Sequence, residues 1–126
     1  MQRQGAISPS LARFLAYQLH ARDLETRKRH KPATERQRRR WERINADHER
    51  ALDDAWEEVG VIAEWYGDIP AAVVSEKYLF DGDWHDIAAA HSLPYDLTKK
   101  LAYHAFLWLD TWRDASMPPY DDKESR

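Results

Sequence analysis

An all-α fold is the class that this sequence predicts, and three observations support it. Only 4 of the 126 residues are glycine, and long stretches without glycine or proline combine Ala, Leu, Arg and Glu, which favour helices. Apolar positions recur at spacings of three or four, which is the helical period. No segment carries a convincing strand pattern. The elements are therefore expected to be helices joined by turns.

The first helix is expected to begin at Ser8, whose side chain caps free amides, with Pro9 at the first helical position. It should run to about Arg29, because Pro32 cannot continue a helix and disfavours helical geometry in the residue before it. Thr34 is then placed to cap a second helix.

The strongest periodicity in the chain predicts a second helix over residues 34–66. At about 1.5 Å per residue this helix would extend roughly 50 Å, longer than a small domain. It should therefore protrude as an arm or break near residues 45–47. Pairing with the first helix, or with a second copy of the protein, would cover its apolar stripe. The positions of the stripe are Trp41, Ile44, His48, Ala51, Leu52, Ala55, Val59, Ile62 and Tyr66.

Three shorter helices are expected after Gly67, which suits the end of the long helix. The third covers residues 69–80, and the fourth covers residues 84–91 with Asp83 as its cap. A tight corner then leads into the fifth, over residues 94–115. The fold class is thus an N-terminal long helix or helical hairpin followed by three C-terminal helices.

The charged residues are unevenly distributed along the chain, which the net charge of -3 does not show. Residues 1–50 carry 13 Lys and Arg against 6 Asp and Glu, whereas residues 51–126 carry 6 against 16. We expect three parts: a basic helical arm or hairpin over residues 1–66, which is a candidate for oligomerisation, a helix-turn-helix over residues 67–117, and a flexible acidic tail over residues 118–126.

Several function classes have no support in the residues. The chain has no cysteine, so disulfides, thiolate metal sites and a cysteine nucleophile are excluded. Its six histidines are scattered, and we expect no metal and no cofactor. Acidic pairs such as Glu57 and Glu58 lie in the long helix, where exposure to solvent is the ordinary explanation. No arrangement of nucleophile and base emerges, so we do not expect an enzyme.

The compartment is expected to be the cytoplasm. No apolar run approaches the roughly 20 residues needed to cross a bilayer, and the first residues lack the apolar core of a signal peptide. We therefore expect no membrane partner.

One stretch carries a recognisable order of motifs. The expected third helix ends in Tyr78-Leu79, and Gly82, Trp84, two polar residues and Ile87-Ala88 follow. After the corner, the expected fifth helix closes with residues 105–109, an Ala-Phe-Leu-Trp-Leu run. In this order and spacing, residues 69–112 resemble region four of bacterial sigma factors and the related ArpU-like and RinA-like phage regulators.

The resemblance implies a small DNA-binding transcriptional regulator of phage or prophage type. Its recognition helix, residues 94–115, would enter the major groove of double-stranded DNA. RNA polymerase or another host protein is a further expected partner, and a homodimer the expected state. The residues that would face bases or phosphates are Tyr95, Asp96, Lys99, Lys100 and Tyr103.

A second candidate site is a run of basic residues around the break between the first two helices. Such a run can hold a nucleic-acid backbone, and Trp41 within it offers a stacking surface. The alternative is an ordinary solvated helix face with Trp41 in the core. The run consists of Arg27, Lys28, Arg29, Lys31, Arg36, Arg38, Arg39, Arg40 and Arg43.

Two other functions stay open. One is a phage assembly or DNA-packaging protein similar to a small terminase subunit, whose long helix builds a ring. The other is a protein-binding adaptor or inhibitor with a repurposed helix-turn-helix. The second alternative is motivated by negative charge near the expected DNA face, which opposes binding to phosphates. The residues concerned are Asp81, Asp83, Asp86 and Asp96.

Overall fold

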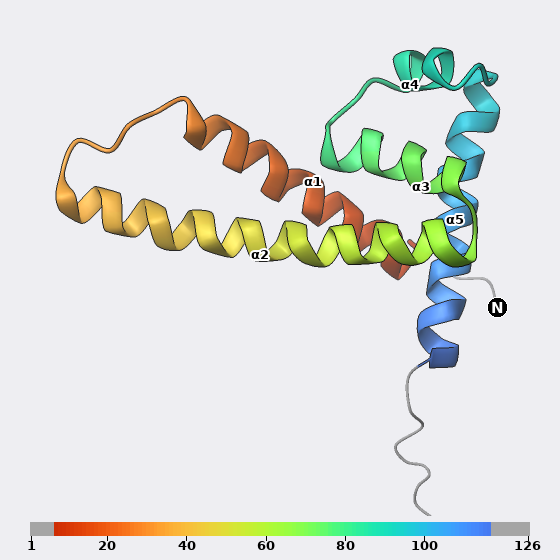
Figure 1. The fold of residues 1–126 in the computed structure, drawn as a ribbon, viewed down its shortest axis with the longest axis horizontal. Helices are drawn as coiled ribbons and strands as arrows, with labels where there is room; N and C mark the ends of the chain where they lie inside the picture. Colours follow the sequence, from red (N-terminus) through yellow and green to blue (C-terminus); the bar gives the residue numbers. More distant parts are fainter. Residues whose placement is uncertain (1–6, 117–126) are drawn as a thin grey trace, which may run out of the picture.

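The computed structural model describes residues 7–116, and all regular structure in this part of the chain is helical (Figure 1). The predicted all-α class is thus confirmed, while the predicted acidic tail, residues 118–126, lies outside the described residues. None of the helices in the described part is long and apolar enough to span a membrane. The elements are α1 (Pro9–Lys28), α2 (Glu35–Trp65), α3 (Asp68–Val74), a π-helical turn η1 (Ser75–Leu79), α4 (Trp84–Ala90) and α5 (Tyr95–Ser116).

The helix starts are where the capping residues predict them. The Ser8 hydroxyl oxygen accepts a hydrogen bond from the amide of Leu11 at 3.2 Å, and that of Thr34 accepts one from Gln37 at 3.1 Å. The carboxylate of Asp83 caps α4. In each case a side-chain oxygen satisfies an amide that has no partner within its own helix.

Helices α1 and α2 form a hairpin that projects from the rest of the molecule (Figure 1). Helix α2 is one unbroken helix of 31 residues, so it does not break near residues 45–47. Its length is about 46 Å. Of the two arrangements left open by the sequence, the structure has the protruding arm, with α1 packed along it.

Polar contacts join the two helices of the hairpin where the apolar stripe is weakest. A ring nitrogen of His20 lies 2.8 Å from one of His48, whose other ring nitrogen lies 2.5 Å from the carboxylate of Asp23. Nearer the turn, the guanidinium of Arg27 lies over the ring of Trp41, 5.5 Å from its centroid. These contacts hold the arm together beyond the hydrophobic core.

The hydrophobic core lies where the base of the hairpin meets the C-terminal helices. Phe14 of α1 is fully buried, and its ring packs against those of Tyr78 and Phe106, with centroids 6.2 and 5.2 Å away. Helix α5 crosses this region (Figure 1). One buried cluster therefore draws on both halves of the chain. Its other members include Ala55, Val59, Ile62, Val73, Val74, Ile87, Ala105 and Leu109.

The expectation that the acidic pairs of the long helix face solvent is wrong for Glu58. Its side chain is buried, and the guanidinium of Arg13 approaches it at 2.6 Å. The hydroxyl of Tyr17 donates to the same carboxylate at 2.6 Å, and burial together with this hydrogen bond raises the pKa of Tyr17. Arg113 of α5 lies 3.7 Å away. Glu57, its neighbour, is exposed as expected.

The expected third helix is not uniform. It begins as α3 and then widens into η1, where the amide of Phe80 donates to the carbonyl of Ser75 at 3.1 Å. This longer-range hydrogen bond accommodates one extra residue in the turn. As a result Tyr78 and Leu79 are both buried, whereas Phe80 is 69% exposed.

Candidate nucleic-acid interface

A short helix and a tight corner set the direction of the expected recognition helix. The carboxylate of Asp83 accepts hydrogen bonds from the amides of His85 and Asp86, which begins α4. At the other end of α4, Ser92 has a φ of 56° and the amide of Leu93 donates to the carbonyl of Ala88 at 2.9 Å. The left-handed residue turns the chain sharply, so that α5 starts against α4 at an angle to it (Figure 1).

Helix α5 has one side in the core. Thr98 is fully buried, and its hydroxyl donates to the carbonyl of Pro94 at 2.8 Å, so this polar group is satisfied within the helix. Leu97, the preceding residue, is 42% exposed. The remaining buried residues of this side are Ala102, Ala105, Phe106 and Leu109.

The five residues expected on the recognition helix all lie on its other sides. Asp96, Lys99, Lys100 and Tyr103 are exposed, and Tyr95 is half-buried at the start of α5. Positions four residues apart lie on one face of a helix, which groups Tyr95, Lys99 and Tyr103 in one row and Asp96 with Lys100 in the next. The structure therefore places these five residues on adjoining rows near the first half of α5.

His85 joins this face, although the sequence offered no signal for it. Its ring is stacked on that of Tyr95, with centroids 4.1 Å apart and planes 20° apart. The ammonium of Lys99 lies 5.3 Å from the centre of the same tyrosine ring. Histidine and tyrosine are ten positions apart on different helices, so only the corner between α4 and α5 brings them together.

Some of the aspartates near this face form contacts within the protein. Asp81 forms an ion pair with Arg22, with N–O distances of 2.8 and 3.0 Å, and this hydrogen bonding lowers the pKa of the carboxyl. Asp83 serves as the cap of α4. The side chains of Asp86 and Asp96 are exposed. Two of the four aspartates are thus occupied by structural contacts.

The second candidate site lies at the turn of the hairpin, and we call its nine basic residues the arm tip. Arg27 and Lys28 end α1, Arg29 and Lys31 lie in the connection, and the other five lie on the first turns of α2. Four of the nine form ion pairs, with Asp23, Glu25, Glu35 or Glu42. Within residues 7–116, the five without an ion pair are Arg29, Lys31, Arg36, Arg40 and Arg43.

Trp41 fits neither of the two expectations made for it. It is half-buried beneath the guanidinium of Arg27 and is absent from the buried core cluster. Its ring therefore supports the hairpin at the arm tip, and part of its surface stays accessible.

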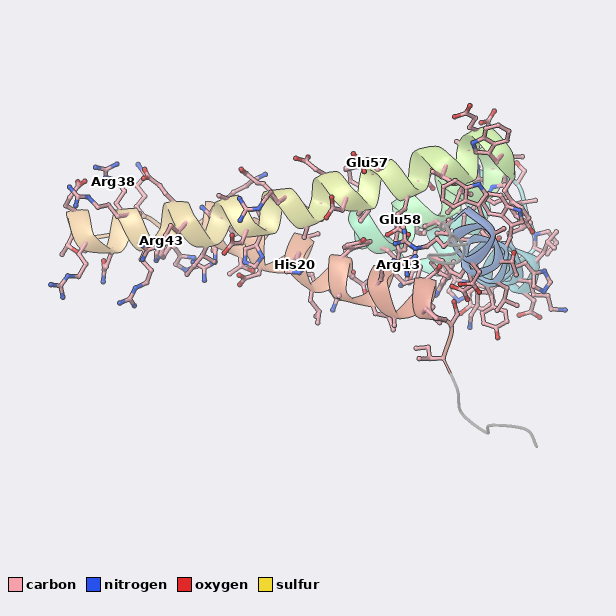
Figure 2. The ribbon with its side chains drawn as sticks, turned by 90° about the horizontal axis from the view of Figure 1, so that it is seen from below. Arg13, His20, Arg38, Arg43, Glu57 and Glu58 are labelled. Carbon is pink, nitrogen blue, oxygen red and sulfur yellow. The ribbon has the colours of Figure 1, made fainter. Side chains whose placement is uncertain are left out.

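The structure does not bring the two basic surfaces together. Figure 2 shows Arg38 and Arg43 toward one end of α2, and Arg13 and Glu58 near its other end, beside α5. From Arg36 to Trp65, α2 is about 44 Å long. The arm tip and the face of α5 are therefore separate surfaces at opposite ends of the molecule.

Comparison with protein-family models, with curated proteins and with solved structures finds no match to this chain. Within the described part of the chain, no three histidine or acidic side chains converge in a way that would hold a metal ion. The exposed side chains of the two candidate surfaces are lysines, arginines and aromatic rings.

Proposed function

We propose that this protein binds double-stranded DNA through α4 and α5 and acts as a small transcriptional regulator of phage or prophage type. The observation that carries the proposal is the division of α5 into a buried side, which includes Thr98, and an exposed side with Lys99 and Lys100. A helix that is anchored along one side and approached by a short capped helix has the form of a recognition helix. The order of motifs in residues 69–112 supports the same function.

The roles of the exposed residues follow from their chemistry. Lysine ammonium groups bind phosphate oxygens or guanine, and a carboxylate such as that of Asp96 accepts a hydrogen bond from cytosine. The stacked pair of His85 and Tyr95 gives Lys99 an aromatic surface to lie on. The arm tip would contribute affinity through phosphate contacts that do not depend on sequence.

The test is binding to random and selected DNA duplexes over a range of salt concentrations. We expect the double variant Lys99→Ala plus Lys100→Ala to bind more weakly and to lower the slope of log K against log salt by about 2. Arg50→Ala is the matched control, because Arg50 is an exposed cation of α2 that pairs with Asp47 and lies outside both surfaces. Unchanged affinity in the lysine variant would exclude α5 as the recognition helix.

The same preparation separates regulation from assembly. A monomer or dimer in light scattering supports a regulator, whereas a ring of many copies supports a packaging protein. Selection of DNA from a random pool at near-physiological salt would give an enriched motif for a regulator and none for a protein-binding adaptor.

A further inference from the structure

A cavity beside the proposed recognition helix has features that DNA binding does not explain. Its volume is about 410 Å³, within the range of small-molecule sites. It lies where α1, η1, α4 and α5 meet. The residues that line it are Leu11, Tyr78, Trp84, Lys99, Lys100, Ala102, Tyr103 and Phe106.

The wall of the cavity suits a flat apolar ring. Tyr78, Ala102 and Phe106 are buried, and the ring of Tyr78 is close to perpendicular to those of Trp84 and Phe106, at centroid distances of 6.3 and 5.4 Å. Aromatic rings pack favourably edge to face and offset face to face. These packed rings form the floor, and the more exposed side chains of Leu11, Trp84 and Tyr103 are the ones that a planar ligand would contact.

Tyr78 also brings a polar group to this wall. The residue is 8% exposed and lines the cavity, and its hydroxyl is not among the buried side-chain atoms that lack a hydrogen-bond partner in the described residues, so solvent can reach it. Burial raises the pKa of Tyr78, so the hydroxyl keeps its proton and is a donor.

The opening of the cavity is positively charged. Lys99 and Lys100 line it, both are exposed, and neither has an ion pair with a described residue. An apolar body inside and a negative group at the opening would satisfy both parts of the cavity.

We propose that this cavity binds a small planar aromatic carboxylate, with its ring against Leu11, Trp84 and Tyr103 and its carboxylate at Lys99 and Lys100. Because these lysines also belong to the DNA face, the ligand and DNA would exclude each other. The mutual exclusion rests on the proposed function, whereas binding of the ligand in the cavity does not.

Calorimetric titration of the full chain with 2-naphthoate tests the site directly, without DNA. We expect binding of 2-naphthoate and much weaker binding of the uncharged 2-naphthalenemethanol. Lys100→Gln should weaken binding by about three-fold, because the carboxylate of 2-naphthoate would lie at Lys99 and Lys100. Lys31→Gln is the matched control outside the cavity, and we expect no change in 2-naphthoate binding from it. Thermal melts monitored by circular dichroism establish that each variant is folded.

The outcomes separate the two proposals. If 2-naphthoate does not bind, or if folded Lys100→Gln binds it as the wild type does, the cavity is not such a site, and the proposed DNA binding is unaffected by that result. If 2-naphthoate binds but no duplex does, the cavity is a ligand site and the proposed DNA binding is excluded. If both bind, addition of 2-naphthoate to a preformed complex should release the duplex, and coexistence of the two ligands would overturn mutual exclusion.

Discussion

At the scale of single residues, Glu58 shows how a charged side chain becomes part of the core. The carboxylate is buried at the base of the hairpin, where Arg13 and Tyr17 of α1 bind it and Arg113 of α5 lies nearby. A buried charge is tolerated when its partners are in place, and removal of one partner leaves another charge poorly solvated. Three helices thus depend on one carboxylate.

Glu58→Ala should lower the free energy of unfolding by about 3 kcal/mol, because it removes the partner of Arg13 within a partly buried network. Urea unfolding followed by circular dichroism measures the change. Glu57→Ala is the matched control at the next position, where the side chain is exposed, and it should change stability by less than about 0.5 kcal/mol. Equal effects of the two variants would show that the Glu58 network contributes nothing.

At the scale of elements, the turn before α4 leaves no space for a side chain at Gly82. A β-carbon at this position would lie 2.8 Å from the carbonyl oxygen of Glu76 and 3.2 Å from the side chain of Ile87. The backbone carbonyl cannot move without disturbing η1, which supports the start of α4. Gly60 differs, because a β-carbon there would meet no atom within 4 Å.

Two glycine-to-alanine variants should therefore have opposite effects. Gly82→Ala should lower the free energy of unfolding by about 1–3 kcal/mol through steric conflict with Glu76. Gly60→Ala, in the middle of an exposed helix face, should raise it by about 0.5–1 kcal/mol, because alanine restricts the unfolded chain more than glycine does. Denaturant unfolding of both variants measures the difference, and a gain in stability from Gly82→Ala would contradict the close approach.

The elements that could be predicted from sequence are those set by local chemistry. Ser8, Thr34 and Asp83 mark helix starts, because a cap depends only on a side chain and the next few amides. The π-helical turn, the burial of Glu58 and the stacking of His85 on Tyr95 were beyond prediction. The burial of Glu58 depends on contact with Arg13 of α1, and the stacking of His85 on Tyr95 depends on the angle of the corner between α4 and α5, and residue spacing alone reports neither.

At the scale of the whole molecule, the two basic surfaces are separated by most of the length of α2. A duplex that touches both must extend about 45 Å, which corresponds to about 13 base pairs. The separation therefore makes the proposed DNA binding sensitive to duplex length.

The salt dependence of binding should reveal this length requirement. For the wild type, we expect a slope of log K against log salt that is steeper by about 2–3 on a duplex of about 30 base pairs than on one of about 10 base pairs. The triple variant Arg36→Ala, Arg40→Ala and Arg43→Ala should show similar slopes on both, because it lacks cations of the arm tip. Fluorescence anisotropy with labelled duplexes measures the slopes, and equal slopes for the wild type would mean that the arm tip does not reach the same duplex.

The uneven charge along α2 also affects how the molecule is oriented as it approaches a charged partner. The first three turns of the helix are rich in arginine, whereas residues 47–64 carry seven acidic side chains and one arginine. This distribution is an electric dipole along the axis of the hairpin, and a dipole rotates in the field of a nearby polyanion. Beside such a surface the protein would turn its hairpin end forward, and added salt would weaken this orientation, because charges are screened beyond a Debye length of about 10 Å at 0.1 M ionic strength.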